Sequence, residues 1–181
     1  EQAHLANLNL LDSHDTARIR TVAGGDVAAG KLAALLLLTF PGALCLYYGT
    51  EVGMEGAREP GSRGGFPWDE ATWDTDLQTT FRQLIALRKD HPALRAPDYR
   101  RVWPPPAHHG TMLTVVERSA EGEEIIVAVN AGDEPEAFTL PLGDFPGNRL
   151  EVLWGHDTVE HGDAAARLTI APRSGSIWLV V

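Results

Sequence analysis

The chain has 181 residues, of which 44% are hydrophobic and 22% charged, a composition sufficient for one large or two small globular domains. Its formal net charge is −10 at pH 7, and its isoelectric point is near 5.0. Nucleic-acid backbones and anionic membranes attract clusters of Lys and Arg, so this acidic balance argues against both as partners and favours a neutral ligand.

A single cysteine, Cys45, excludes an intrachain disulfide and a cysteine-rich zinc site. This cysteine usage favours a reducing compartment such as the cytoplasm. The longest apolar run, residues 32–40, is shorter than the roughly 20 residues that span a bilayer, and it predicts a buried helix. The chain begins at Glu1 without an initiator methionine or a signal-peptide pattern, so we expect it to be part of a longer polypeptide.

The first half of the sequence alternates between strand and helix patterns. Residues 7–11 predict a short strand, and residues 26–39, rich in Ala and Leu, predict a helix that Pro41-Gly42 ends. Residues 43–48 are apolar throughout, as expected of a parallel strand buried on both faces. This order is typical of a βαβ unit.

A long loop and a second helix follow. Residues 51–74 are rich in glycine and mixed charges without any period, and long ordered loops often carry function. Asp74 or Thr75 is the expected N-cap of the next helix, and Pro92 lies just past its end. Apolar spacing predicts one inward face for this helix, formed by Leu77, Phe81, Leu84, Ile85 and Arg88.

From about Tyr99 the pattern changes to short strands with turn signals between them. Such a series without an intervening helix predicts an antiparallel β-sandwich. The boundary falls near residues 94–97, and Pro104-Pro105-Pro106 predicts a stiff loop. The predicted strands are residues 100–103, 112–118, 124–130, 137–140, 150–154, 167–170 and 176–181.

The sharpest local feature is residues 9–18, Asn-Leu-Leu-Asp-Ser-His-Asp-Thr-Ala-Arg. A strand that ends in polar, ionisable residues is what a βα-barrel presents at its catalytic face. A second interpretation is that Ser13, Asp15 or Thr16 caps the helix that follows. These residues alone leave both interpretations open.

This stretch closely resembles the last conserved motif of the α-amylase superfamily, glycoside hydrolase family thirteen, and in particular that of neopullulanase, cyclomaltodextrinase and maltogenic amylase. Three further stretches agree in order and spacing: residues 41–54, Arg63 with residues 67–69, and residues 84–89. The resemblance implies an α/β plus all-β fold. Residues 1–94 would be the last two βα units of a (β/α)8 TIM barrel, and residues 95–181 a β-sandwich C-terminal domain.

The resemblance also implies catalytic roles. Asp15 would be the invariant carboxylate that grips sugar hydroxyls and stabilises the oxocarbenium-like transition state, and His14 would assist it. The nucleophile and the general acid of a retaining glycosidase would lie upstream of Glu1, and no stretch here replaces them. The parent protein would hydrolyse α-glucosidic bonds in maltodextrin or cyclodextrin, whereas this segment alone should be inactive.

Other residues have implied contacts with substrate. Glu59 and Arg63 match an acidic residue and an arginine that contact a sugar beyond the cleavage subsite. Glu59 stands for the more usual Asp, and Thr50 replaces an acidic residue, which leaves the preferred glucan open. Arg18 either touches a sugar or pairs with a neighbouring carboxylate.

Several aromatic side chains also have two interpretations. Tyr47 and Tyr48 end the second strand, and packing is the favoured role for at least one of them. Trp68 and Trp73 could stack on sugar rings or pack against a barrel rim.

Neither a cofactor nor a metal site is predicted. The seven histidines show no ligand spacing, and His108-His109 falls in the proline-rich loop. Calcium occurs in some amylases, but the sequence has no dense oxygen-ligand loop. The expected partners are an α-glucan oligosaccharide and the missing part of the barrel, supplied by the same polypeptide or by another chain, a second copy included.

Two alternative functions stay open. The chain could be a non-catalytic carbohydrate-binding or assembly module, which the absent nucleophile and acid favour. Within the enzyme class, a transglycosylase or a trehalose synthase-type relative would use the same carboxylates.

Overall fold

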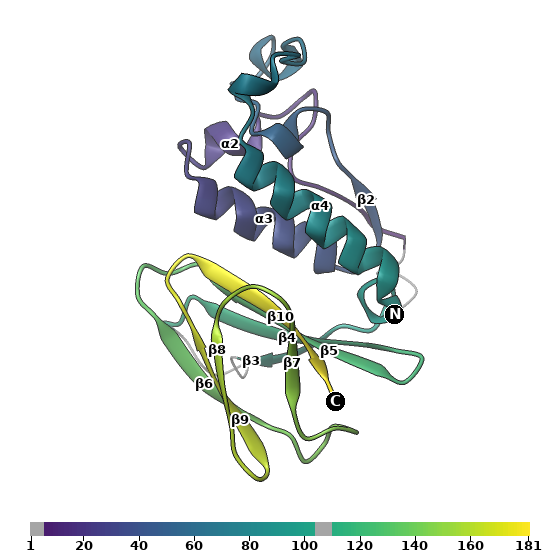
Figure 1. The fold of residues 1–181 in the computed structure, drawn as a ribbon. Coiled ribbons are helices and arrows are strands. Elements are labelled where there is room, and N and C mark those ends of the chain that lie inside the picture. Colours follow the sequence, from purple (N-terminus) through teal and green to yellow (C-terminus); the bar gives the residue numbers. More distant parts are fainter. Residues whose placement is uncertain (1–5, 104–109) are drawn as a thin grey trace.

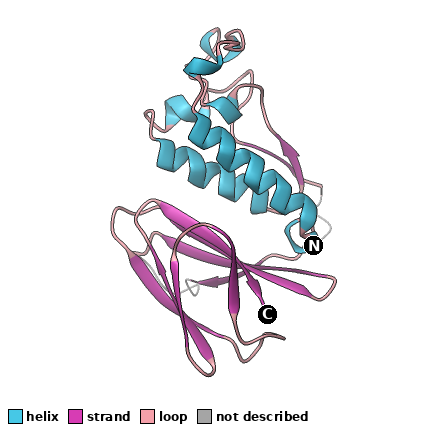
Figure 2. Cartoon of the chain, in the orientation of Figure 1, coloured by secondary structure: helices cyan, strands magenta, loops and turns pink. Residues whose placement is uncertain are grey.

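The computed structural model describes residues 6–103 and 110–181. The long helices and most of the strands separate in space: a helical part lies above an all-strand part (Figure 1; Figure 2). The predicted Pro104-Pro105-Pro106 loop and His108-His109 lie outside the described residues.

The helical part contains a two-stranded parallel sheet, in which Leu8 pairs with Ala43 and Leu10 with Cys45. Its strands and α-helices are β1 (Leu8–Leu10), α2 (Ile19–Val22), α3 (Val27–Thr39), β2 (Ala43–Cys45) and α4 (Thr75–Asp90). Four 3-10 helices occupy the connections: Thr50–Val52, Gly61–Arg63, Glu70–Thr72 and Pro92–Leu94. The strand–helix–strand order therefore agrees with the prediction.

Both long helices begin at an aspartate. The Asp26 carboxylate accepts the amides of Ala28 and Ala29 at the start of α3. Asp74, rather than Thr75, is the N-cap of α4, and its carboxylate accepts the amide of Leu77 at 3.0 Å. Each carboxylate satisfies amides that have no partner within the helix, so the sequence fixes both starting points.

Two details of the helical part differ from the expectations. Residues 19–22 form the short helix α2, which has no buried residue and therefore leaves no apolar periodicity in the sequence. The expected burial of both faces of the second strand is wrong, because Ala43 is exposed and its neighbours are only half-buried. In the described chain β2 pairs only with β1, so its other edge is open, and Leu8 of β1 is 63% exposed.

The all-strand part consists of two antiparallel sheets. One has the order β3-β4-β5-β10-β7 and the other the order β6-β9-β8. The strands are β3 (Arg100–Trp103), β4 (Leu113–Ala120), β5 (Glu123–Asn130), β6 (Glu136–Pro141), β7 (Leu150–Trp154), β8 (Thr158–His161), β9 (Ala165–Ile170) and β10 (Ser174–Val180). Strand β8 was not predicted, because it is an edge strand with a single half-buried apolar residue, Val159.

The five-stranded sheet is the central layer, and both of its faces are buried. Along β5, Ile125, Val127 and Val129 pack with the helices, whereas Ile126 and Ala128 pack with the three-stranded sheet. Successive side chains of a strand point to opposite faces, which explains this alternation. The helix–sheet contact thus extends the core across the proposed boundary near residues 94–97, and the boundary itself stays a prediction.

Two arginines join the helices to the central sheet. Arg88 lies on α4 and Arg118 on β4, where Arg118 is fully buried on the same face as Val116. Their guanidinium groups donate to backbone carbonyls at the end of α3 and in the connections beyond it. The acceptors are Leu38, Phe40, Gly42 and Leu94 for Arg88, and Thr39, Ala96 and Asp98 for Arg118.

Among these acceptors, the carbonyls of Leu38, Thr39 and Phe40 lie at the end of α3, where they have no partner within the helix and where the negative end of the helix attracts cations. Burial, together with the positive charge of Arg88, lowers the pKa of Arg118 to about 10. Burial also lowers the pKa of Arg88. Arg118 therefore remains protonated at neutral pH and continues to donate to all three of its acceptors.

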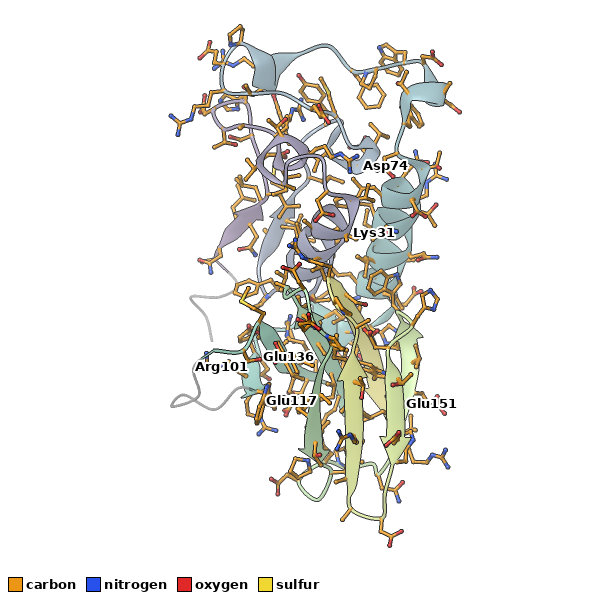
Figure 3. All side chains as sticks on the ribbon, turned by 90° about the vertical axis from the view of Figure 1, so that its left-hand side faces the viewer. Lys31, Asp74, Arg101, Glu117, Glu136 and Glu151 are labelled. Carbon is orange, nitrogen blue, oxygen red and sulfur yellow. The ribbon has the colours of Figure 1, made fainter. Side chains whose placement is uncertain are left out.

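Replacing Arg118 with methionine should destabilise the fold strongly. The Arg118→Met change leaves three backbone carbonyls without their donor, which should lower the free energy of unfolding by about 3 kcal/mol. Urea unfolding measures the difference. Arg101→Met is the control, since Arg101 is an exposed side chain on the neighbouring strand β3 (Figure 3). Equal stability of the two variants would contradict the proposed importance of the buried guanidinium.

Candidate functional site

A connection follows each of the two parallel strands where that strand ends. Residues 11–18 connect β1 to α2, and residues 46–74 connect β2 to α4. Since β1 and β2 are parallel and in register, their carboxyl ends lie at the same edge of the sheet. The two connections therefore meet there, and this edge is where open α/β folds bind ligands.

The connection after β1 is held by a compact turn. The amide of Ser13 donates to Thr16 Oγ1 at 2.9 Å, and the amide of Asp15 donates to Ser13 Oγ at 3.2 Å. The first amide of α2, that of Ile19, is accepted by Asp12 at 2.9 Å. The helix-cap interpretation is therefore wrong for Ser13, Asp15 and Thr16, because Asp12 supplies the carboxylate instead.

Four of the five predicted site residues form one exposed cluster. His14 Nε2 lies 3.1 Å from one carboxylate oxygen of Asp15, and Arg63 Nη2 lies 3.3 Å from the other. Arg63 also pairs with Glu59 at 3.0 Å. The Asp15 side chain is 68% exposed. Two carboxylates and two basic groups thus face solvent together.

Arg18, the fifth predicted residue, lies beneath this cluster and is fully buried. Its guanidinium carbon lies 4.2 Å from the ring centroid of Tyr47 and 4.5 Å from that of Tyr48. Its side chain donates to the backbone carbonyls of Tyr48 and Ser62. Its Nη2 atom has no hydrogen-bond partner among the described residues, so the aromatic rings supply much of its remaining contact. Arg18 does not share the solvent-facing position of the other four residues.

Asp12 and Thr50 form a buried anchor that residue patterns did not reveal. Asp12 is 2% exposed and accepts both the amide of Ile19 and the hydroxyl of Thr50, the latter at 2.7 Å. Thr50 is buried as well, so it faces the interior rather than a substrate. The signal available in the sequence was the position of Asp12, directly after the apolar strand and ahead of the turn.

The aromatic residues considered for sugar stacking form two groups along the connection after β2, the tyrosine pair Tyr47-Tyr48 and, around Phe66, the tryptophans Trp68 and Trp73. The Tyr48 hydroxyl donates to the Gly64 carbonyl at 2.8 Å, while burial and a hydrogen bond with Tyr48 raise the pKa of Tyr47. Trp73 is half-buried and donates to Pro67, which favours packing for this residue. Trp68 is 84% exposed, so its ring surface is open to solvent.

Two classes of feature are absent from the described part of the chain. Within residues 6–103 and 110–181, no three His, Cys, Asp or Glu side chains come together as a metal site would need. The described helices include none that is both long and apolar enough to cross a bilayer.

Comparison with known proteins identifies the family to which this chain belongs. The family described as alpha amylase, catalytic domain, matches residues 1–99. The chain belongs to the alpha-amylase family. The resemblance drawn from the four motif stretches is thereby confirmed, and both parallel strands and the connections that follow them lie inside the matched region.

Individual relatives agree with the neopullulanase-like assignment. A cyclomaltodextrinase from a Bacillus species is 46% identical over 154 residues, which cover 85% of this chain and 25% of that protein. Neopullulanase 2 from Thermoactinomyces vulgaris is 33% identical over 179 residues, covering 98% of this chain and 30% of the relative. The chain therefore spans about a quarter to a third of these curated relatives.

Solved structures show the same fold. A debranching enzyme from Nostoc punctiforme superposes with a TM-score of 0.83 at 40% identity, covering 96% of this chain and 35% of that one. An α-amylase from Anoxybacillus superposes with a TM-score of 0.87 at 25% identity, covering 100% of this chain and 39% of that one. The helical part and the two antiparallel sheets therefore recur together in this family.

Truncation of the two aspartates of the motif should lower stability by different amounts. Asp12→Ala removes a buried acceptor and leaves the Ile19 amide and the Thr50 hydroxyl unpaired, which should cost about 2 kcal/mol of stability. Asp15→Ala changes an exposed side chain and should cost less than about 0.5 kcal/mol. Thermal unfolding of both variants tests the contrast. A larger loss for Asp15→Ala would contradict the assignment of Asp12 as the anchor.

Proposed function

We propose that this chain supplies the transition-state-binding part of the active site of an α-glucan hydrolase. The observation that carries the proposal is the exposed cluster of His14, Asp15, Glu59 and Arg63 at the carboxyl edge of a parallel strand pair. The cluster lies in a chain whose first 99 residues match the catalytic domain of the α-amylase family. The family match and the chemistry of the exposed cluster therefore both support an active site at this edge of the strand pair.

Asp15 is the proposed transition-state stabiliser. Positive charge develops on the anomeric carbon during glycoside cleavage, and hydrogen bonds to sugar hydroxyls that strengthen at that moment lower the barrier. Each oxygen of Asp15 has one basic neighbour, His14 or Arg63, and retains lone pairs for a sugar hydroxyl. These neighbours hold the carboxylate in one orientation while leaving it open to substrate.

Glu59 and Arg63 are proposed to contact a sugar beyond the cleavage subsite. Their 3.0 Å ion pair offers donors and acceptors to hydroxyl groups while adding no net charge, which suits a neutral oligosaccharide. The relatives named cyclomaltodextrinase and neopullulanase support maltodextrins or cyclodextrins as substrates. We assign no sugar contact to Arg18, because its guanidinium is buried.

The remaining catalytic groups are proposed to come from outside these residues. Retaining hydrolysis needs a nucleophile and an acid about 5 to 5.5 Å apart on either side of the glycosidic bond. We propose that residues 1–94 complete a (β/α)8 barrel with further strands that cover β1 and β2. Residues 95–181 would then be the attached β-sandwich domain. The exposed apolar side chains of Leu8 and Leu10 on β1 support this completion.

In the complete enzyme, Asp15→Asn should lower kcat/KM on maltoheptaose by about 100-fold or more, since it weakens a group that acts mainly in the transition state. The melting temperature should stay within about 1 °C, because the side chain is exposed. Asp133→Asn is the matched control, since Asp133 is an exposed, arginine-paired aspartate of the sandwich. Near-normal turnover by Asp15→Asn would refute the proposed function.

The 181-residue chain alone should be inactive on maltoheptaose and β-cyclodextrin and should self-associate. Several of its exposed apolar side chains lie on the strand pair or directly beside it in the sequence: Leu8, Leu10 and Leu46. Open strand edges beside such a surface favour association. Light scattering after size exclusion measures the mass. A stable monomer, or hydrolysis by the isolated chain, would contradict the proposed completion.

A further inference from the structure

Arg18 joins the two connections that build the candidate site. Its backbone amide donates to the Gly56 carbonyl at 2.9 Å, while its side chain donates to the carbonyls of Tyr48 and Ser62. These three acceptors lie on separate segments of the connection after β2, whereas Arg18 belongs to the connection after β1. One buried residue therefore fixes the relative position of both.

Ser62 continues this link to the exposed cluster. Ser62 is fully buried, its carbonyl accepts from Arg18 Nε at 3.1 Å, and its hydroxyl donates to the His14 carbonyl at 2.9 Å. The next residue, Arg63, donates to the same His14 carbonyl at 3.2 Å and contacts Asp15. The path from Arg18 to Asp15 thus passes through one buried serine and its neighbour.

The surroundings of Arg18 leave little room for adjustment. A Cβ atom at Gly56 would lie 2.3 Å from the Gly61 carbonyl oxygen and 3.2 Å from Arg18 Cγ. The loop backbone therefore packs directly on the arginine stem, and a side chain at position 56 would separate the two. Movement of the guanidinium would be passed on to residues 61–63.

We propose that Arg18 is a positioning residue for Asp15, acting through Ser62 and Arg63. The inference rests on the proposed function of Asp15 as the transition-state stabiliser. A planar guanidinium donates to two carbonyls in fixed directions, whereas a lysine ammonium is a single point charge that cannot reproduce this fork. A shift of about 1 Å in a catalytic group can cost about 100-fold in rate.

A double-mutant cycle in the complete enzyme tests this role. Arg18→Lys alone should lower kcat/KM on maltoheptaose by about 10-fold or more, mainly through kcat. In an Asp15→Asn background, the same substitution should change kcat/KM by less than about 2-fold, because the group that it positions has already been weakened. Equal losses in both backgrounds would overturn the proposal, since a purely structural role would be additive.

Arg88→Lys is the matched control. Arg88 is another arginine that donates to several backbone carbonyls, but those acceptors lie at the end of α3 and beyond, away from the cluster. It should lower the melting temperature and show no coupling to Asp15→Asn. Coupling of the same size for Arg88→Lys would show that the cycle reports general destabilisation, and would also overturn the proposal.

Ser62→Ala keeps the test decisive if Arg18→Lys fails to fold. This change removes only the hydroxyl that donates to the His14 carbonyl and keeps the carbonyl that Arg18 needs. Its loss of kcat/KM should likewise shrink in the Asp15→Asn background, and an additive loss would refute the path through Ser62. An inactive parent enzyme would refute the proposed function itself, whereas activity with additive effects would refute only the role of Arg18.

Discussion

The end of α3 imposes the constraint on which the rest of the structure depends. A helix leaves its last carbonyls unpaired, and here that end is covered by both α4 and the central sheet. Arg88 and Arg118 satisfy these carbonyls from two different elements. Because Arg88 also reaches the Gly42 carbonyl, directly before β2, the same contact sets where the second parallel strand begins.

Arginine has two distinct roles in this chain, one for buried side chains and one for an exposed side chain. Arg88, Arg118 and Arg18 each collect carbonyl groups from segments that are distant in sequence, which a planar group with several donors does well. Arg63 instead remains half-exposed and pairs with Glu59 and Asp15. Three arginines thus hold the backbone in place, and one contributes to the surface that a substrate would meet.

Much of the fold could be predicted because local patterns and packing agree. The spacing of Leu77, Phe81 and Leu84 predicted the buried face of α4, and the position of Asp74 predicted its start. Runs of β-branched residues predicted most strands of the two sheets. The polar edge strand β8 and the single-turn helix α2 left no such pattern, because neither buries a periodic apolar face. The predicted burial of β2 failed because a strand's burial depends on its neighbours as well as on its own residues.

The residues of the candidate site could be predicted from the sequence, but the separate structural role of each residue could not. The motif indicated His14 and Asp15, and the cluster contains both together with Glu59 and Arg63. Residue type does not distinguish two aspartates three positions apart, and only the position of Asp12 directly after the strand indicates that Asp12 is buried whereas Asp15 is exposed. Nor could spacing show that Arg18 turns inward beneath two tyrosine rings. Such differences arise from the meeting of two connections that α2, α3 and β2 separate in the sequence.

The double-faced central sheet has a consequence for building chimaeras from this chain. Because Ile125, Val127 and Val129 complete the core beneath the helices, the two-sheet part cannot simply be replaced by that of another protein. A foreign sandwich joined after residue 94 would have to bring a matching apolar stripe and an arginine at the position of Arg118. Recombination within the family is therefore expected to succeed only when the last helices and the sheet that supports them are inherited together.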